Sequence, residues 1–128
     1  MKLLLDTHAL LWWWTDDRHL SPRVRAVIAD ERNEVFASPA SAWEIATKQR
    51  LGRLSLPVVT LRRYEELLAA DGFASLPITA AHALTAGSYP HPYGDPFDRM
   101  LAAQAEIERL PLVSKDRALR QFGVELIW

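Results

Sequence analysis

The most informative segment of the chain is Leu3-Leu4-Leu5-Asp6-Thr7-His8, near its start. Three consecutive leucines that end at an acid are typical of a short strand buried in a sheet. Asp6 would then lie at the carboxyl end of that strand, and in a parallel sheet this edge is where ligands bind. Asp is also a common helix N-cap, so this stretch alone leaves two roles open for Asp6, helix capping and ligand binding.

The rest of the chain alternates between short apolar runs and segments with helical signals. Further strands are predicted at 35–38, 73–76, 111–114 and 124–127. Helices are predicted at 8–14, 21–30, 42–50, 60–71, 79–86, 97–109 and 116–121, with Ser21, Ser41 and Thr79 as N-caps and Gly52, Gly72 and Gly87 as stops. Residues 54–57 should be extended, and 88–94 should be loop. Strands interleaved with helices indicate an α/β fold with a parallel sheet and right-handed crossovers.

The composition is that of one globular domain, residues 1–128, in which 49% of the residues are apolar. The absence of cysteine excludes disulfides and thiolate metal sites, and it is compatible with a cytoplasmic location. No apolar run approaches the ~20 residues that a membrane span requires, so we expect a soluble protein. The formal net charge is −1, which excludes the strongly basic footprint of a dedicated DNA-binding domain.

Positive charge is nevertheless concentrated in two parts of the chain. One cluster comprises Lys48, Arg50, Arg53, Arg62 and Arg63, and the other comprises Lys115, Arg117 and Arg120. Both clusters are compatible with solvated helix faces. They are also compatible with a rim of phosphate-contacting side chains around an acidic centre.

Four more carboxylates stand where a strand ends or within the start of a helix. Glu44 lies in an otherwise apolar helix segment, Asp95 and Asp98 open the longest predicted helix, and Asp116 follows a buried strand. Glu44 could also be a surface residue of an amphipathic helix, and Asp95 and Asp98 could simply complement a helix dipole. Gathered with Asp6 at one edge, the acids would repel one another unless a cation were present, and clustered oxygen ligands suit Mg²⁺ or Mn²⁺. The leading interpretation is a metal-dependent hydrolase.

Two neighbouring side chains could support such a site. Ser114 could hold a water or a phosphate oxygen, or it could cap the helix at 116. Arg99 could neutralise one of the acids or contact a phosphate. The four histidines form no i,i+4 pair, which disfavours zinc. No Gly-rich phosphate loop and no Gly-x-Ser-x-Gly elbow occurs, which disfavours nucleotide hydrolysis and acyl transfer.

Four segments, taken in order, resemble the motifs of PIN-domain ribonucleases, and more narrowly those of VapC-type toxins of toxin–antitoxin pairs. They are Leu4-Leu5-Asp6-Thr7-His8, 41–48 with Leu51-Gly52-Arg53-Leu54, 95–105, and Leu112-Val113-Ser114-Lys115-Asp116. The resemblance extends to the terminal Leu126-Ile127-Trp128. Close relatives usually carry two histidines just before the Asp-Pro-Phe-Asp segment, where this chain has Pro92 and Tyr93.

The resemblance implies a three-layer α/β/α sandwich with a central five-stranded parallel sheet, a Mg²⁺ or Mn²⁺ site, and cleavage of RNA. The family's acids match Asp6, Glu44, Asp98 and Asp116, which we expect to bind the metal and to be catalytic, and Asp95 is a further acid of this subgroup. The resemblance also implies a homodimer and a cognate antitoxin protein that wraps the toxin and blocks the site.

Two other functions suit the same fold: a PIN domain that binds RNA without cutting it, and a module that only binds a protein partner. The presence of all the acids favours the enzyme. The run Trp12-Trp13-Trp14 favours a partner surface, because successive residues of a helix point roughly 100° apart. At least one of the three rings should therefore be exposed or lie at an interface.

Overall fold

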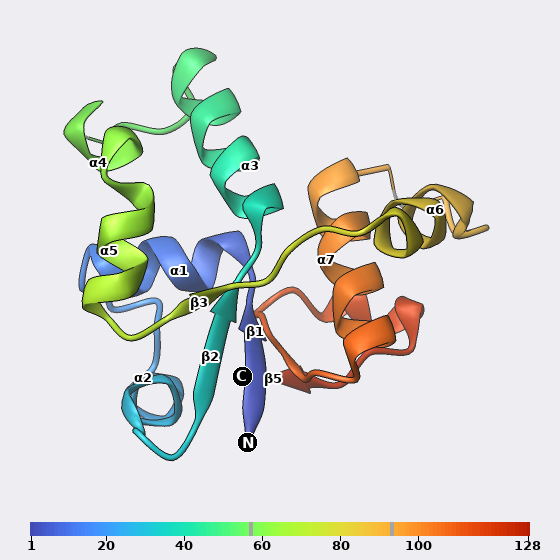
Figure 1. Cartoon of the computed structure of the whole chain (residues 1–128), viewed down its shortest axis with the longest axis horizontal. Coiled ribbons are helices and arrows are strands. Elements are labelled where there is room, and N and C mark those ends of the chain that lie inside the picture. The colour runs from blue at the N-terminus through green and yellow to red at the C-terminus, as the bar shows by residue number, and fades with distance from the viewer. Residues whose placement is uncertain (57, 93) are drawn as a thin grey trace.

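The computed structural model describes residues 1–56, 58–92 and 94–128, which build a five-stranded, all-parallel sheet (Figure 1). The strands are β1 (Lys2–Leu5), β2 (Glu34–Ala37), β3 (Ala74–Ser75), β4 (Leu112–Val113) and β5 (Leu126–Ile127). The helices are α1 (Thr7–Trp14), α2 (Pro22–Ala29), α3 (Pro39–Arg50), α4 (Val58–Arg62), α5 (Tyr64–Ala70), α6 (Ala80–Ser88), α7 (Pro96–Glu108) and the 3₁₀ helix η1 (Arg117–Phe122). The predicted parallel five-stranded sheet is confirmed.

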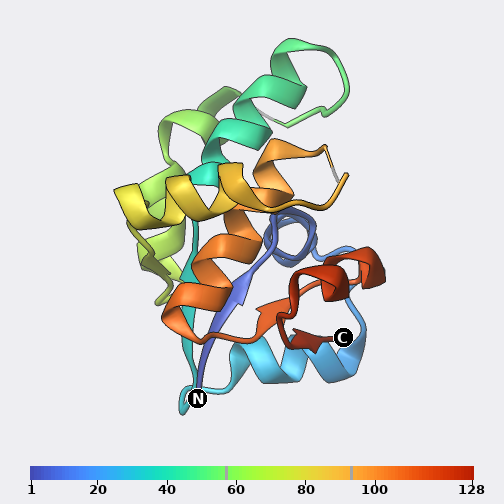
Figure 2. The ribbon, with the colours of Figure 1, turned by 90° about the vertical axis from the view of Figure 1, so that its right-hand side faces the viewer.

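The side chains of β1 alternate between two cores, one on each face of the sheet, because successive residues of a strand point in opposite directions. Leu3 and Leu5 pack with α1, α2 and α5, and Leu4 packs with α7, β4 and η1. Figures 1 and 2 show these helices on the two sides of the sheet. The expected three-layer α/β/α sandwich is therefore confirmed. None of the helices in the described ranges is long and apolar enough to cross a membrane.

The strand order places the middle of the sheet at a topological switch point. Across the sheet the order is β3-β2-β1-β4-β5, so the chain winds outward from β1 in one direction and then resumes on its other side. In open parallel sheets, ligands bind beyond the carboxyl ends of the strands at such a point. The switch lies between β1, which is followed by Asp6, and β4, which is followed by Ser114.

Several predicted helix ends are wrong by a few residues. The N-cap of α3 is Ser38 rather than Ser41, because Pro39 is already set for the first helical position. The hydroxyl of Ser41 instead accepts a hydrogen bond from Thr7 Oγ1 at 2.9 Å. The predicted helix 60–71 is two helices, α4 and α5, with Arg63 between them, and α6 continues past Gly87 to Ser88. The predictions for Pro57 and Tyr93 lie outside the described residues.

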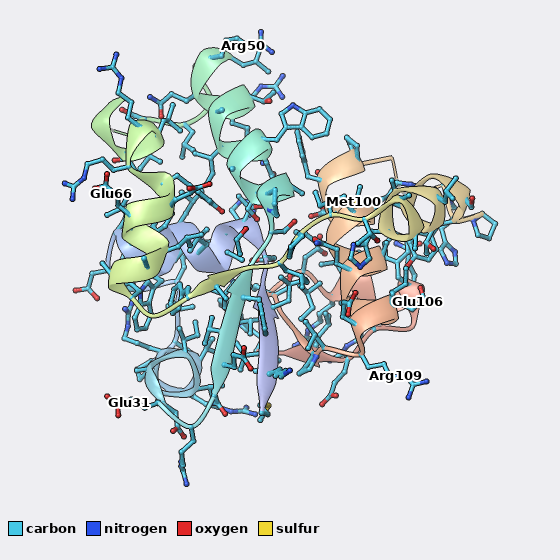
Figure 3. All side chains as sticks on the ribbon, viewed as in Figure 1. Glu31, Arg50, Glu66, Met100, Glu106 and Arg109 are labelled. Atoms are coloured by element: carbon cyan, nitrogen blue, oxygen red, sulfur yellow. The ribbon has the colours of Figure 1, made fainter. Side chains whose placement is uncertain are left out.

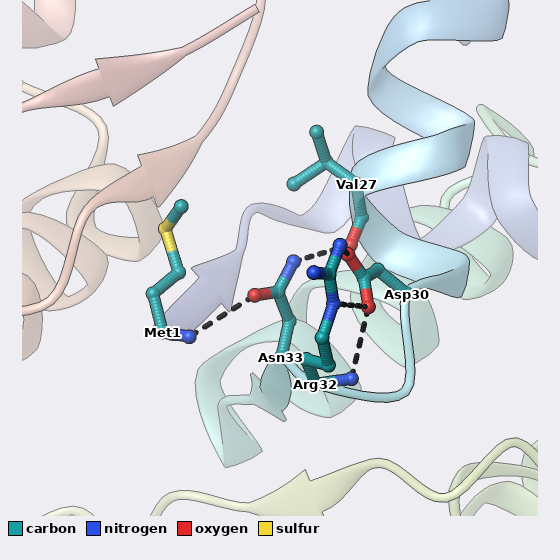
Figure 4. Close-up of polar contacts among 5 residues, drawn as sticks. All are labelled: Met1, Val27, Asp30, Arg32 and Asn33. Carbon is teal, nitrogen blue, oxygen red and sulfur yellow. Dashed lines mark hydrogen bonds and ion pairs between the residues drawn. The ribbon is translucent and has the colours of Figure 1, made fainter.

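A hydrogen-bonded turn fixes the amino end of β1 against the turn between α2 and β2 (Figure 4). The terminal amino group of Met1 donates to Asn33 Oδ1 at 3.0 Å, and Asn33 Nδ2 donates to the Val27 carbonyl at 2.9 Å. Arg32 donates to both carboxylate oxygens of Asp30, at 3.0 and 2.8 Å. These contacts lie next to the first pair of the β1–β2 register, in which Lys2 is opposite Glu34.

The three consecutive tryptophans are all half-buried, because different parts of the chain cover different sides of α1. The ring of Trp12 lies 5.8 Å from Trp128, Trp13 lies 5.6 Å from Phe73, and Trp14 meets Tyr64 edge-on at 5.5 Å. None of the three is a fully exposed ring. The strongly exposed tryptophan is Trp43, of which 62% is accessible.

Candidate active site

A cleft of about 260 Å³ opens at the carboxyl edge of the sheet, and the sequence-predicted acids meet in it. Its lining comprises Asp6, His8, Trp12, Glu44, Lys48, Asp95, Asp98, Lys115 and Asp116. The acids come from the ends of β1 and β4 and from the helices α3 and α7. Segments far apart in the sequence thus bring five carboxylates to the switch point of the sheet.

Of the two roles that its sequence position left open, Asp6 has the helix cap, and it stands in the cleft where ligand binding stays a prediction. It caps α1, since its Oδ1 accepts a hydrogen bond from the Ala9 amide at 2.7 Å, and it lines the cleft. Only 6% of the residue is exposed. Burial raises the pKa of the Asp6 carboxyl, while hydrogen bonds from the Ser114 hydroxyl and the Ala9 amide act in the opposite direction. The site therefore holds a carboxylate whose negative charge is only partly compensated by the protein.

Glu44 is a buried residue, which excludes its interpretation as a surface glutamate of an amphipathic helix. It is 2% exposed, and its carboxylate is hydrogen-bonded to the ammonium group of Lys48 on the next turn of α3. Burying a carboxylate is costly unless it is paired or bound to a cation. Lys48 supplies that pairing here. The spacing of four residues is the signal by which sequence reasoning could have found the pair.

The start of α7 carries two more acids of the cleft. Asp95 is the N-cap, and its Oδ1 accepts hydrogen bonds from the Phe97 amide at 2.9 Å and the Asp98 amide at 3.1 Å. Asp98 follows in the first turn and lines the cleft. The helix N-terminus favours negative charge at both positions. The dipole interpretation and a place in the cleft are therefore compatible.

Arg99 holds the connection between α6 and α7. Its guanidinium donates to three backbone carbonyls, those of Ala86 at 2.9 Å, His91 at 3.1 Å and Tyr89 at 2.7 Å. This arrangement ties the end of α6, together with Tyr89 and His91, to the first turn of α7 beside Asp95. The assignment of Arg99 as a phosphate contact stays a prediction.

At the end of β4, the helix cap that was considered for Ser114 is provided by Asp116 instead. Asp116, not Ser114, caps η1, because its Oδ1 accepts from the Ala118 amide at 3.0 Å. Ser114 is buried, accepts a hydrogen bond from the Asp116 amide at 3.0 Å, and its hydroxyl acts to lower the pKa of the Asp6 carboxyl. It therefore lies beside both Asp6 and Asp116 at the switch point. A role in holding a phosphate oxygen stays a prediction.

The side chains that line the cleft are chemically suited to a hard cation. In the present side-chain conformations, however, their carboxylates do not point to one common position. Within the described ranges, no group of three acids or histidines is arranged so as to hold a metal ion. Glu44 turns to Lys48, and one oxygen of Asp6 receives the Ala9 amide. The donors that line the cleft are nevertheless almost entirely carboxylate oxygens, which Mg²⁺ and Mn²⁺ prefer, and two of them are buried.

Sequence reasoning missed three features of the site. Lys48 was expected on a solvated helix face or in a phosphate-contacting rim, whereas it pairs with a buried acid. The aromatic wall formed by His8 and Trp12 had no signal beyond the apolar helix that carries them. The hydrogen bond from Thr7 to Ser41, which joins α1 to α3 beside the acids, depends on tertiary contacts alone.

The fold agrees with comparisons to known proteins. The family model described as PIN domain matches residues 3–125. Ribonuclease VapC22 of Mycobacterium tuberculosis is 32% identical over 119 residues, which cover 92% of this chain and 89% of that protein. Ribonuclease VapC16 of the same organism is 38% identical over 58 residues, which cover 45% of this chain and 41% of that protein. The chain belongs to the PIN-domain family.

Solved structures support the same fold. The crystal structure of VapBC2 from Rickettsia felis, bound to a DNA fragment from its promoter, aligns with a TM-score of 0.70 over 99% of this chain and 98% of that chain, at 13% identity. The crystal structure of FitAcB from Neisseria gonorrhoeae aligns with a TM-score of 0.61 over 100% and 97%, at 22% identity. At these identities the likeness establishes the shared fold.

Proposed function

We infer that this chain is an endoribonuclease of the VapC type, the toxin of a toxin–antitoxin pair, which hydrolyses phosphodiester bonds of RNA. The inference is supported by the PIN-domain match and by the ribonuclease VapC22, which is similar over nearly the whole chain. The observation that carries it is the cleft at the switch point, because five carboxylates from distant segments line it together.

We propose that the reaction depends on Mg²⁺ or Mn²⁺. Asp6, Asp98 and Asp116 would hold the ion directly or through water, Glu44 would ligate a second ion or orient the attacking water, and Asp95 is a less certain ligand. A divalent ion in such a site lowers the pKa of bound water and neutralises charge on the reacting phosphate. The proposal is supported by the five carboxylates among the lining side chains and by the burial of two of them.

The protein's own groups would position these ligands and the substrate. Ser114 and the Ala9 amide orient the Asp6 carboxylate by hydrogen bonds, and Arg99 ties the end of α6 to the first turn of α7 beside Asp95. Lys48 and Lys115, which also line the cleft, would attract the phosphate of the RNA. Since the net charge is −1, attraction of RNA depends on such local cations rather than on the protein as a whole.

Single-turnover cleavage of a structured RNA tests the proposal. The wild-type protein should cut with Mg²⁺ or Mn²⁺ and be inactive in EDTA, and Asp98→Asn should retain the fold and lose cleavage almost entirely. Glu65→Gln is the matched control, because Glu65 is an exposed acid on α5 away from the cleft, and it should cut like the wild type. Cleavage that persists in EDTA after nuclease-free purification would contradict the metal mechanism.

We also propose that the chain acts in the cytoplasm, with a cognate antitoxin as partner and a homodimer as its assembly. The antitoxin is supported by the solved neighbours VapBC2 and FitAcB. For the dimer, the apolar hollow beside Trp43 is a better interface than the tryptophans of α1, which are half-buried. It measures about 250 Å³, lies between α3, α6 and α7, and is lined by Trp43, Ile78 and Met100 among others.

A PIN domain that binds RNA or a partner without catalysis is the alternative. It would not require the acids, yet all five stand in one cleft. The same experiment separates the two functions. A binding module would bind RNA in the presence of Mg²⁺ without cutting it, and Asp98→Asn would not change the amount of RNA cleaved.

A further inference from the structure

A second hollow lies directly beside the acidic cleft and has the opposite charge. It measures about 360 Å³ and is lined by Ser114, Lys115, Arg117, Arg120, Leu126 and Trp128. Lys115 belongs to the lining of both cavities, so the hollow continues the cleft on the side of β4, η1 and β5. The three cations follow from the sequence Lys115-Asp116-Arg117, with Arg120 on the next turn of η1.

The side chains that line this hollow are cationic, polar or apolar, and none of them is acidic. Within the part of the chain that the structure describes, none of the three cations takes part in an ion pair. Two other hollows differ in character. The one beneath Trp13 is lined by Asp30, Glu31 and Asp71, and the one beside Trp43 is apolar apart from Arg99.

We propose that this basic hollow binds backbone phosphates of the RNA strand whose scissile phosphate lies in the acidic cleft. The proposal rests on the ribonuclease function inferred above. A strand cut in the cleft must leave it on some side, and the shared Lys115 makes this hollow a direct continuation. Unpaired lysine and arginine side chains are the groups with which proteins hold phosphates.

The aromatic residues favour RNA over an acidic segment of a protein partner. Trp128 forms a wall of the basic hollow, and its ring lies 5.8 Å from the ring of Trp12, which lines the acidic cleft. Cations that track a backbone, combined with aromatic rings on which bases stack, are the combination that binds single-stranded nucleic acid. An acidic peptide would need the cations but not the rings.

The test is the affinity for RNA as a function of salt, measured in an Asp98→Asn background so that the RNA stays intact. The variant combines Arg117→Gln with Arg120→Gln, and the probe is a single-stranded RNA of mixed sequence observed by fluorescence anisotropy. Loss of two phosphate contacts should weaken binding about tenfold at moderate salt and reduce the slope of log affinity against log salt by roughly 1.4. Arg117→Lys with Arg120→Lys should restore most of the affinity, because the charge is kept.

Arg109→Gln is the control. It removes one positive charge at the carboxyl end of α7, whereas the acids of the cleft lie at the amino end, and the Arg109 side chain projects into solvent (Figure 3). It should leave both the affinity and the salt slope unchanged. With Asp98 intact, the double glutamine variant should raise KM for RNA and leave kcat nearly unchanged.

The outcomes separate this proposal from the proposed function. A wild-type protein that cuts RNA, together with a double glutamine variant of unaltered affinity and slope, overturns the phosphate site alone. A wild-type protein that neither binds nor cuts RNA overturns both. A variant that loses affinity for the antitoxin while RNA binding is unchanged assigns the hollow to the protein partner and also overturns the proposal.

Discussion

The ammonium group of Lys48 is hydrogen-bonded to the buried carboxylate of Glu44, one helical turn earlier on α3. Lys48 is about one-third exposed and Glu44 almost fully buried, so the lysine enters the acidic cleft from its solvent side. In this arrangement the protein supplies its own cation to one acid of the site. A divalent ion ligated by Glu44 would have to replace Lys48 at that carboxylate.

Lys48→Met should therefore destabilise the metal-free protein by about 1–3 kcal/mol, because the Glu44 carboxylate would be left buried without a partner. The double variant Glu44→Gln with Lys48→Met should recover most of this loss, since no buried charge then remains. Urea unfolding in EDTA measures both free energies of unfolding. Equal stabilities of the single and double variants would show that the ion pair does not compensate the burial of Glu44.

Asp6→Asn should raise the melting temperature of the metal-free protein by a few degrees, because burial disfavours the charged carboxylate and the amide can still accept the Ala9 hydrogen bond. The same variant should lose the rise in melting temperature that Mn²⁺ gives the wild type. Asp116→Asn is the informative comparison. Asp116 is exposed, so its amide should abolish the Mn²⁺ response without stabilising the metal-free protein. A melting temperature of the wild-type protein that does not change with Mn²⁺ would count against the metal site.

Arg99→Ala should reduce the free energy of unfolding by about 3 kcal/mol, because three backbone carbonyls lose a charged donor. Hydrogen exchange should become faster in α6 and in the described residues of the loop that follows it. Arg99→Lys should behave much like alanine, since one ammonium group cannot reproduce the guanidinium geometry. If Arg99 contacts phosphate instead, RNA affinity will fall while the stability is retained.

Trp43→Ser should shift a homodimer toward monomer, because Trp43 is the largest exposed apolar side chain of the hollow between α3, α6 and α7. Leu51→Ser is the control, since Leu51 is 50% exposed on the same part of the chain but does not line that hollow. Light scattering across a concentration series measures the association. A dimer that survives Trp43→Ser and dissociates in Trp13→Ser would return the interface to the tryptophans of α1.

The carboxyl of Asp30 should titrate at about 2, because hydrogen bonds from Arg32 lower its pKa from 3.8. A lowered pKa means that the stabilising contribution is fully present above pH 3.8 and is lost as the pH falls toward 2. Arg32→Ala should return the pKa of Asp30 toward 3.8, as measured by NMR titration. The same variant should remove this part of the acid sensitivity. An unchanged pKa in Arg32→Ala would place the cause of the shift elsewhere.

The elements that the sequence predicted well are those with strong local signals. The leucine run of β1, the Ser21-Pro22 start of α2 and the Thr79 cap of α6 all occur where they were expected. The place of the acids was also predicted from local sequence. A carboxylate that follows a parallel strand, or that lies near the start of the next helix, is brought to the carboxyl edge of the sheet. All of these acids line the cleft, while their roles in catalysis stay a prediction.

The errors occur where tertiary contacts decide. Ser38 and Ser41 are both good caps, and the choice between them followed from Pro39 and from the bond between Ser41 and Thr7. The burial of the three tryptophans could not be predicted from helix geometry, because it depends on Phe73, Tyr64 and Trp128 closing around α1. The exposure of Trp43 could likewise not be predicted, because its neighbours in the sequence are mostly apolar.

The central place of β1 also has a consequence for the order in which the protein is made. β1 is synthesised first, but it pairs with β4, whose residues lie near the other end of the chain. Such distant pairings form late, because a long loop must close before any contact compensates the lost entropy. The side of the cleft that carries Asp98 and Asp116 therefore cannot form until α7 and β4 have left the ribosome. A growing chain would carry Asp6 and Glu44 without Asp98 and Asp116, and we expect it to be harmless to the RNA from which it is translated.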